Sequence, residues 1–147
     1  PAVQFVFLGE GPCQWSADNC RFAGAASRGG VASWLNRGDL LVLPSLSEGT
    51  PMCVLEALAT ETPVACTEVG GCPELVEEGV TGMLIKGHDA DAVTEVVKAA
   101  LEHDGWKMAR GRDLVRKEFE IGSIAERIAE LYKRVSGYSV PPQKTPM

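Results

Sequence analysis

The 147-residue sequence has no apolar run long enough to cross a membrane and no excess of positive charge. A transmembrane helix needs about 20 consecutive apolar residues. The first residues lack the basic region of a secretory signal and are expected to form a strand. We therefore expect a cytoplasmic protein, at most peripheral to a membrane in its full-length form. The 14 Lys and Arg against 20 Asp and Glu argue against a nucleic-acid partner, because a phosphate backbone requires a basic face.

The cysteines and histidines are also too few and too scattered for a metal centre. Five cysteines include no C-x-x-C pair, and the two histidines lie in a different region. This spacing argues against zinc, and free thiols are typical of a reducing cytosol. We expect no metal and no cofactor. The cysteines are Cys13, Cys20, Cys53, Cys66 and Cys72.

Short apolar runs alternate with helical patterns along the chain. This alternation predicts an α/β fold, a doubly wound, mainly parallel and Rossmann-like sheet with helices on both faces. We expect one domain over 1–135 and an extended or disordered tail over 136–147, where three prolines occur. The expected strands are 3–8, 21–24, 40–44, 63–67 and 82–86. The expected helices are 31–36, 52–60, 73–77, one from 89 onward, 107–119 and 121–135.

The apolar runs indicate how two of these elements pack. The almost unbroken apolar run over 3–8 is typical of a strand buried on both faces. In the last helix an apolar stripe contains Ile124, Ile128 and Leu131, with charges on the other side.

The expected topology brings three turns to one edge of the sheet. Such sheets bind ligands beyond the carboxyl ends of their strands. Gly9–Pro12, Ser45–Thr50 and Glu68–Gly71 each follow a predicted strand, so they should share one rim. For Gly9–Pro12 and Gly70–Gly71 a plain chain reversal is favoured, and lining of the ligand cleft is the alternative.

The most informative segment is the turn and helix from Glu48 to Glu56. Thr50 is expected to be the helix N-cap, with Pro51 at the first helical position, where its missing N–H costs nothing. Free N–H groups at a helix start favour a diphosphate. Gly49 allows a close backbone approach.

The two glutamates of this segment have binding roles open to them. Glu56 shares a helix side with apolar residues, an unusual place for a solvated charge, and its two oxygens can accept both hydroxyls of a ribose. A solvated helix face or a salt bridge is the alternative. For Glu48 the alternative to ligand binding is capping of the following turn.

The Glu-x7-Glu spacing, set in LLVLPSLSEGTPMCVLEALATETPVACTEVGGCPELVEEGVTGML, resembles the signature of glycosyltransferase family four. These are retaining enzymes of the two-domain GT-B architecture. The resemblance extends over Phe5–Val135 and is to the family's carboxyl-terminal, donor-binding domain. It implies a UDP- or GDP-sugar donor, no metal, and a saccharide, lipid or small-metabolite acceptor bound by another domain.

The resemblance also implies roles for individual residues. Glu48, the catalytic candidate, would hold hydroxyls of the donor sugar, and Glu56 would bind the nucleotide ribose. The backbone around Gly49 and Thr50 and the amides of Met52 and Cys53 would approach the sugar and the distal phosphate.

The sequence departs from the family in two places. The first strand–helix unit, which carries a basic Arg and Lys and lies at the centre of the family's sheet, is missing. An unpaired apolar edge should result, for which a homodimer or a partner chain would provide cover. The helix between Pro12 and Arg21 should be short or lost, because only eight residues intervene.

The leading hypothesis is the donor-binding domain of a retaining glycosyltransferase. On its own the chain is expected to be inactive, because half a cleft cannot orient both substrates. The alternatives are a non-catalytic nucleotide-binding or truncated module acting with a partner chain, and part of a nucleotide-sugar epimerase. A dinucleotide-binding domain is disfavoured, since its Gly-x-Gly-x-x-Gly would need glycine where Gln14 stands.

Overall fold

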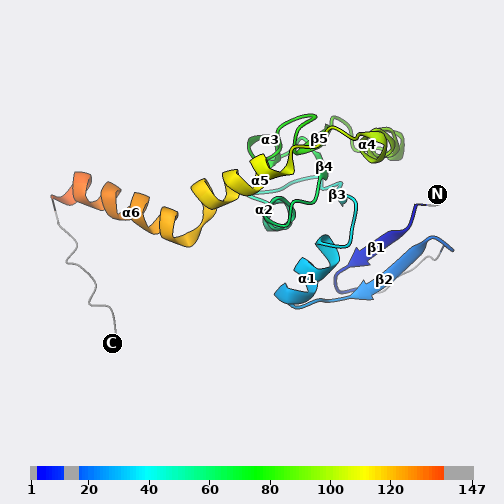
Figure 1. Cartoon of the computed structure of the whole chain (residues 1–147), viewed down its shortest axis with the longest axis horizontal. Helices are drawn as coiled ribbons and strands as arrows, with labels where there is room; N and C mark the ends of the chain where they lie inside the picture. The colour runs from blue at the N-terminus through cyan, green and yellow to red at the C-terminus, as the bar shows by residue number, and fades with distance from the viewer. Residues whose placement is uncertain (1–2, 12–16, 138–147) are drawn as a thin grey trace.

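The computed structural model describes residues 3–11 and 17–137, and it confirms the α/β fold class (Figure 1). Each predicted strand and helix that lies in the described residues is present, with bounds shifted by a few residues. The strands are β1 (Phe5–Leu8), β2 (Cys20–Gly24), β3 (Leu41–Leu43), β4 (Val64–Thr67) and β5 (Gly82–Ile85). The helices are α1 (Arg28–Leu35), α2 (Met52–Ala59), α3 (Cys72–Leu75), α4 (Ala90–Glu102), α5 (Met108–Leu114), η1 (Val115–Phe119) and α6 (Ile121–Ser136).

The strands form two parallel sheets, whereas one sheet was expected. β1 pairs with β2, and β3, β4 and β5 pair in that order. No pairing joins β1 to β3 among the described residues. The amide of Phe5 donates to the Asn19 carbonyl at 2.8 Å, so the backbone groups of the alternate residues Val6 and Leu8 face away from β2. No strand within residues 3–11 and 17–137 pairs with these groups, which agrees with the unpaired edge that the sequence predicted.

The prediction that β1 is buried on both faces is wrong for this structure. Its apolar side chains remain 36–41% exposed, and the ring of Phe7 stacks on Phe22 of β2 with the centroids 4.7 Å apart. A two-stranded sheet with an open edge has too few neighbours to bury both faces.

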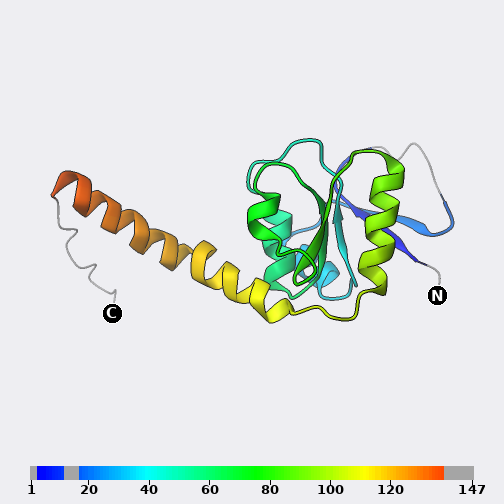
Figure 2. The same cartoon turned by 90° about the horizontal axis from the view of Figure 1, so that it is seen from above.

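The core is centred on the three-stranded sheet. All four residues of β4 are buried, because helices cover it on both sides: α2 and α3 lie on one face and α4 on the other (Figure 2). The hydrophobic core includes the four buried residues of α2, namely Val54, Leu55, Ala57 and Leu58. This packing fixes α2 beside the carboxyl ends of β3 and β4.

The helices α5 and η1 pack on the core through Met108, Val115 and Phe119, whereas α6 extends away from it. The helix predicted over 107–119 is α5 followed by one π-helical turn, η1. α6 projects from the body in both views (Figures 1 and 2). Its predicted stripe, Ile124, Ile128 and Leu131, is 37–51% exposed, so it is not part of the core.

Two features predicted from the sequence lie partly outside the described residues. The predicted tail falls mainly on residues 138–147, which lie outside the described residues, as do Pro12 and the first half of the segment in which a helix was expected to be short or lost. No helix among the described residues has the length and apolarity needed to span a membrane.

Candidate functional site

The loop after β3 holds the Glu48 carboxylate in place. β3 ends at Leu43, and the chain then turns through Ser45 to Glu48. The Ser45 hydroxyl donates to Glu48 Oε1 at 2.6 Å, a short distance typical of a bond to a charged acceptor. Glu48 is half-buried, so its orientation is restricted while one side remains open to solvent.

The start of α2 differs from the prediction. Thr50 was expected as the N-cap, but Pro51 occupies that position with φ −72° and ψ 108°, and it makes no side-chain cap. Proline has no side-chain oxygen that could accept a hydrogen bond from the N–H groups of the first turn. Val54 is the first residue here whose N–H reaches a carbonyl, that of Pro51 at 3.1 Å. Among the described residues, the amides of Met52 and Cys53 therefore lack a carbonyl acceptor.

Glu56 follows one turn further along α2. It is half-buried, and neither a hydrogen bond nor an ion pair engages its carboxylate within residues 3–11 and 17–137. The Thr60 hydroxyl donates to the Glu56 carbonyl oxygen at 2.9 Å and leaves the side chain free. The salt bridge considered from the sequence is absent among these residues, so both carboxylate oxygens are available to a ligand.

Cys53 lies within electrostatic range of both glutamates. Burial raises the pKa of the Cys53 thiol, and the negative charges of Glu48 and, more weakly, Glu56 raise it further, against nearby backbone N–H groups that lower it. Both carboxylates therefore lie close enough to Cys53, in the first turn of α2, to act on its thiol. The two ends of the Glu-x7-Glu motif thus lie near the start of one helix.

The loop after β4 packs directly on the loop after β3. The Gly71 amide donates to the Gly49 carbonyl oxygen at 2.7 Å. Gly70 has φ +53°, and a Cβ there would overlap the carbonyl oxygen of Glu48. From the sequence, two roles were considered for Gly70–Gly71: a chain reversal and a wall of the ligand cleft. The structure adds a role that the sequence analysis missed, since these glycines support the backbone of the Glu48 turn.

The other predicted features are less closely tied to this surface. Gly9 and Gly11 make no described contact with the Glu48 turn. Within residues 3–11 and 17–137, no group of three or more His, Cys, Asp or Glu side chains could hold a metal ion. A hollow of about 270 Å³ lies elsewhere, beside Thr81 at the amino end of β5. Glu77 and Arg110 in its wall already pair with each other at 3.0 Å, so we place the candidate site at the Glu48–Glu56 surface.

Comparisons with known proteins agree on one family. Residues 1–103 match the family model for glycosyl transferases group 1. TuaC of Bacillus subtilis (strain 168), named for glycosyl transfer in teichuronic acid biosynthesis, is 35% identical over 140 residues, which are 92% of this chain and 36% of TuaC. A D-inositol 3-phosphate glycosyltransferase of Corynebacterium efficiens is 33% identical over 67% of this chain and 24% of its own length. The chain thus spans about a quarter to a third of these curated relatives.

Solved structures show the same fold. Sucrose-phosphate synthase from Thermosynechococcus elongatus superposes with a TM-score of 0.75 at 25% identity, over 91% of this chain and 39% of the other. Anabaena HepE, solved in complex with UDP and glucose, superposes with a TM-score of 0.70 at 21% identity, over 80% and 33% of the two chains. The chain belongs to the group 1 glycosyl transferases, and it has the Rossmann-like fold of one half of their GT-B architecture.

Proposed function

We propose that this chain is the donor-binding part of a retaining glycosyltransferase that moves a hexose from a UDP- or GDP-sugar to an acceptor hydroxyl. The unpaired, half-buried Glu56 carboxylate carries the proposal. This carboxylate has no protein donor among the described residues and is open on one side, and two adjacent ribose hydroxyls match its two oxygens. The HepE structure with UDP and glucose supports a nucleotide sugar as the ligand class.

The rest of the surface fits the other parts of such a donor. Glu48 faces the sugar, and its carboxylate accepts a hydrogen bond from one of the sugar hydroxyls. The open amides of Met52 and Cys53, at the positive end of the α2 dipole, receive the distal phosphate. Gly49 and Thr50 bring the backbone close to the ligand, and Pro51 offers no donor.

The proposed sugar transfer needs no metal ion, because backbone amides stabilise the departing diphosphate. The acceptor, a saccharide, lipid or small metabolite, is bound by the remainder of the full-length protein. This chain alone is expected to bind the donor without transferring the sugar efficiently, because it matches only 36% and 24% of the length of these two relatives.

Titration of UDP and GDP into the chain tests the proposal, with the amide resonances of Gly49–Glu56 followed by NMR. We expect one nucleotide to shift these signals at up to millimolar concentration. Glu56→Gln should weaken that binding roughly 10- to 100-fold, because hydrogen bonds to a charged group contribute about 1.5–3 kcal/mol. Glu95→Gln, an exposed glutamate of α4, is the matched control. Equal affinity of the Glu56→Gln variant and the parent chain would refute the ribose role.

A further inference from the structure

Two hydroxyls connect the buried strand β4 with the Glu48 carboxylate. Thr67, the last residue of β4, is fully buried, and its hydroxyl donates to the carbonyl oxygen of Ser45 at 2.5 Å. The same hydroxyl lies 3.4 Å from the Leu43 carbonyl oxygen at the end of β3. The Ser45 hydroxyl then donates to Glu48 Oε1 at 2.6 Å. The side chains of Thr67 and Ser45 thus link the Glu48 carboxylate to the buried strand β4.

The direction of these bonds follows from the chemistry of the groups. An ionised carboxylate only accepts hydrogen bonds, so the Ser45 hydroxyl is the donor. Carbonyl oxygens also only accept, so the Thr67 hydroxyl is the donor to Ser45. The backbone of Ser45 is therefore bound by the Thr67 hydroxyl, while the Ser45 side chain binds Glu48.

The bond has a consequence for what Glu48 offers a ligand. Glu48 Oε1 carries the Ser45 hydroxyl, whereas Glu48 Oε2 has no hydrogen-bond donor or cation within residues 3–11 and 17–137. The bond to one oxygen restricts the rotation of the carboxylate, and the other oxygen is left for a sugar hydroxyl. Preorganisation of this kind strengthens binding because less rotational freedom is lost when the ligand arrives.

We propose that Ser45 is a positioning residue for Glu48 and that Thr67 holds Ser45, so that the sugar part of the donor is recognised through hydroxyls that do not touch it. The proposal rests on the proposed function for the identity of the ligand. Its structural part, the orientation of Glu48 by Ser45, stands independently of any ligand.

The first test measures the rotamer of Glu48 in the ligand-free chain through its three-bond side-chain couplings. The parent should show one χ1 rotamer, Ser45→Ala should show averaged couplings, and Ser45→Thr should restore them. Thr67→Val, which keeps the shape and removes the hydroxyl, should shift the couplings in the same direction. Ser33→Ala, at an exposed position on α1, is the control. Unchanged Glu48 couplings in Ser45→Ala overturn the proposal.

The second test separates recognition of the sugar from recognition of the nucleotide. The probes are UDP-glucose, UDP-N-acetylglucosamine and GDP-mannose, each compared with UDP or GDP. Ser45→Ala should weaken the best nucleotide sugar about tenfold and change the affinity for its nucleotide less than twofold. A general loss of structure would weaken both equally. If no probe binds more tightly than its nucleotide, or if Ser45→Ala leaves the ratio unchanged, the inferred role in sugar recognition is overturned. If the parent binds neither nucleotide, the proposed function fails, and the rotamer test still decides the role of Ser45.

Discussion

The amide of Gly71 donates a hydrogen bond to the carbonyl oxygen of Gly49 at 2.7 Å. The two residues are 22 positions apart, yet they join the loops that follow the neighbouring strands β4 and β3. Because these strands are parallel, their carboxyl ends meet at one edge. The bond therefore makes the loop after β4 part of the candidate site.

Replacement of Gly70 by alanine should destabilise the chain and disturb the Glu48 turn. The φ of +53° costs an alanine about 1–2 kcal/mol, and its Cβ would also overlap the Glu48 carbonyl oxygen. Gly79→Ala is the matched control, since Gly79 has φ +69° but open space around its Cβ. We expect urea unfolding to give a larger loss for Gly70→Ala, together with shifted amide signals of Gly49. Equal losses in the two variants would contradict the close packing of the loops.

The Cys53 thiol should be a slow nucleophile that reports on the site. Its pKa is raised by burial and then by the charges of Glu48 and Glu56, so less of the reactive thiolate is present at pH 8. With iodoacetamide and peptide mass mapping, Cys53 should react more slowly than Cys20, and a bound nucleotide should slow it further. Alkylation of Cys53 at an unchanged rate with saturating nucleotide would argue that the ligand binds elsewhere.

The start of α4 should loosen in acid. The Asp89 carboxylate caps the helix by accepting from the Ala92 amide at 2.9 Å, and this hydrogen bond lowers the pKa of Asp89 in the folded chain. A lowered folded pKa means that the stabilisation is complete above the unfolded pKa, near 4, and is lost as the pH falls through the folded value.

Hydrogen exchange of the Ala92 and Val93 amides should therefore accelerate below about pH 4, relative to the intrinsic exchange rate. Asp89→Asn keeps a capping side chain without a titrating group, so its protection should be flat over this range. An identical acid dependence in both proteins would show that another group controls the helix start.

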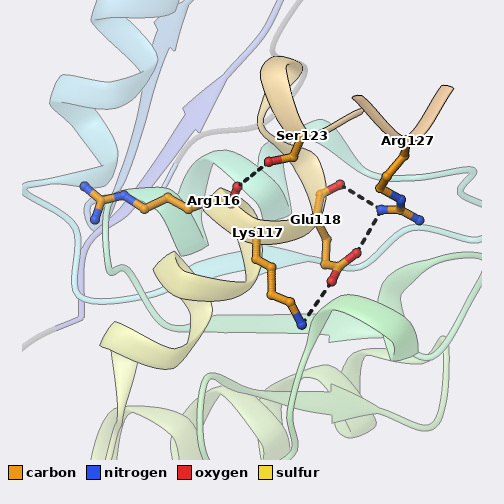
Figure 3. Close-up of polar contacts among 5 residues, drawn as sticks. All are labelled: Arg116, Lys117, Glu118, Ser123 and Arg127. Carbon is orange, nitrogen blue, oxygen red and sulfur yellow. Dashed lines mark hydrogen bonds and ion pairs between the residues drawn. The ribbon is translucent and has the colours of Figure 1, made fainter. Parts of the chain in front are cut away.

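The junction between η1 and α6 should depend on Glu118 and Arg127. Arg127 Nη1 lies 2.8 Å from Glu118 Oε2, Lys117 Nζ lies 3.4 Å from Glu118 Oε1, and the Ser123 hydroxyl donates to the Arg116 carbonyl (Figure 3). Exposed ion pairs contribute about 0.2–1 kcal/mol. We expect Arg127→Ala to leave global stability almost unchanged.

The local effect of Arg127→Ala should be larger than its global effect. Amide exchange at the start of α6 should increase, and added salt should reduce the difference from the parent chain because salt screens exposed charges. Lys133→Ala, which removes a pair of 3.8 Å within α6, is the control. Equal exchange at the start of α6 in both variants would show that the junction does not depend on the Glu118–Arg127 pair.

Local sequence signals identified the elements of the fold well. Leu41–Leu43 and Val64–Thr67 are short apolar runs bounded by turn residues, and α2 ends at Ala59, before Pro63, which could not continue a helix. The position of the helix cap was wrong by one residue at Thr50, because a cap depends on backbone geometry that residue preference alone does not fix. The π turn at Val115–Phe119 also has no sequence signal that we could use.

The sequence by itself determined the α/β class, the order of the elements and the placing of Glu48 and Glu56 around one helix start, because periodicity, turn residues and spacing are properties of adjacent residues. Only the tertiary structure decided that the strands form two sheets, that Gly70 and Gly71 support the Glu48 turn, and that Thr67 and Ser45 lead from the core to Glu48. The contacts between the two loops and the Thr67–Ser45 bond join residues 22 positions apart. They depend on which strands pair and on how closely the loops approach, and no local pattern specifies either.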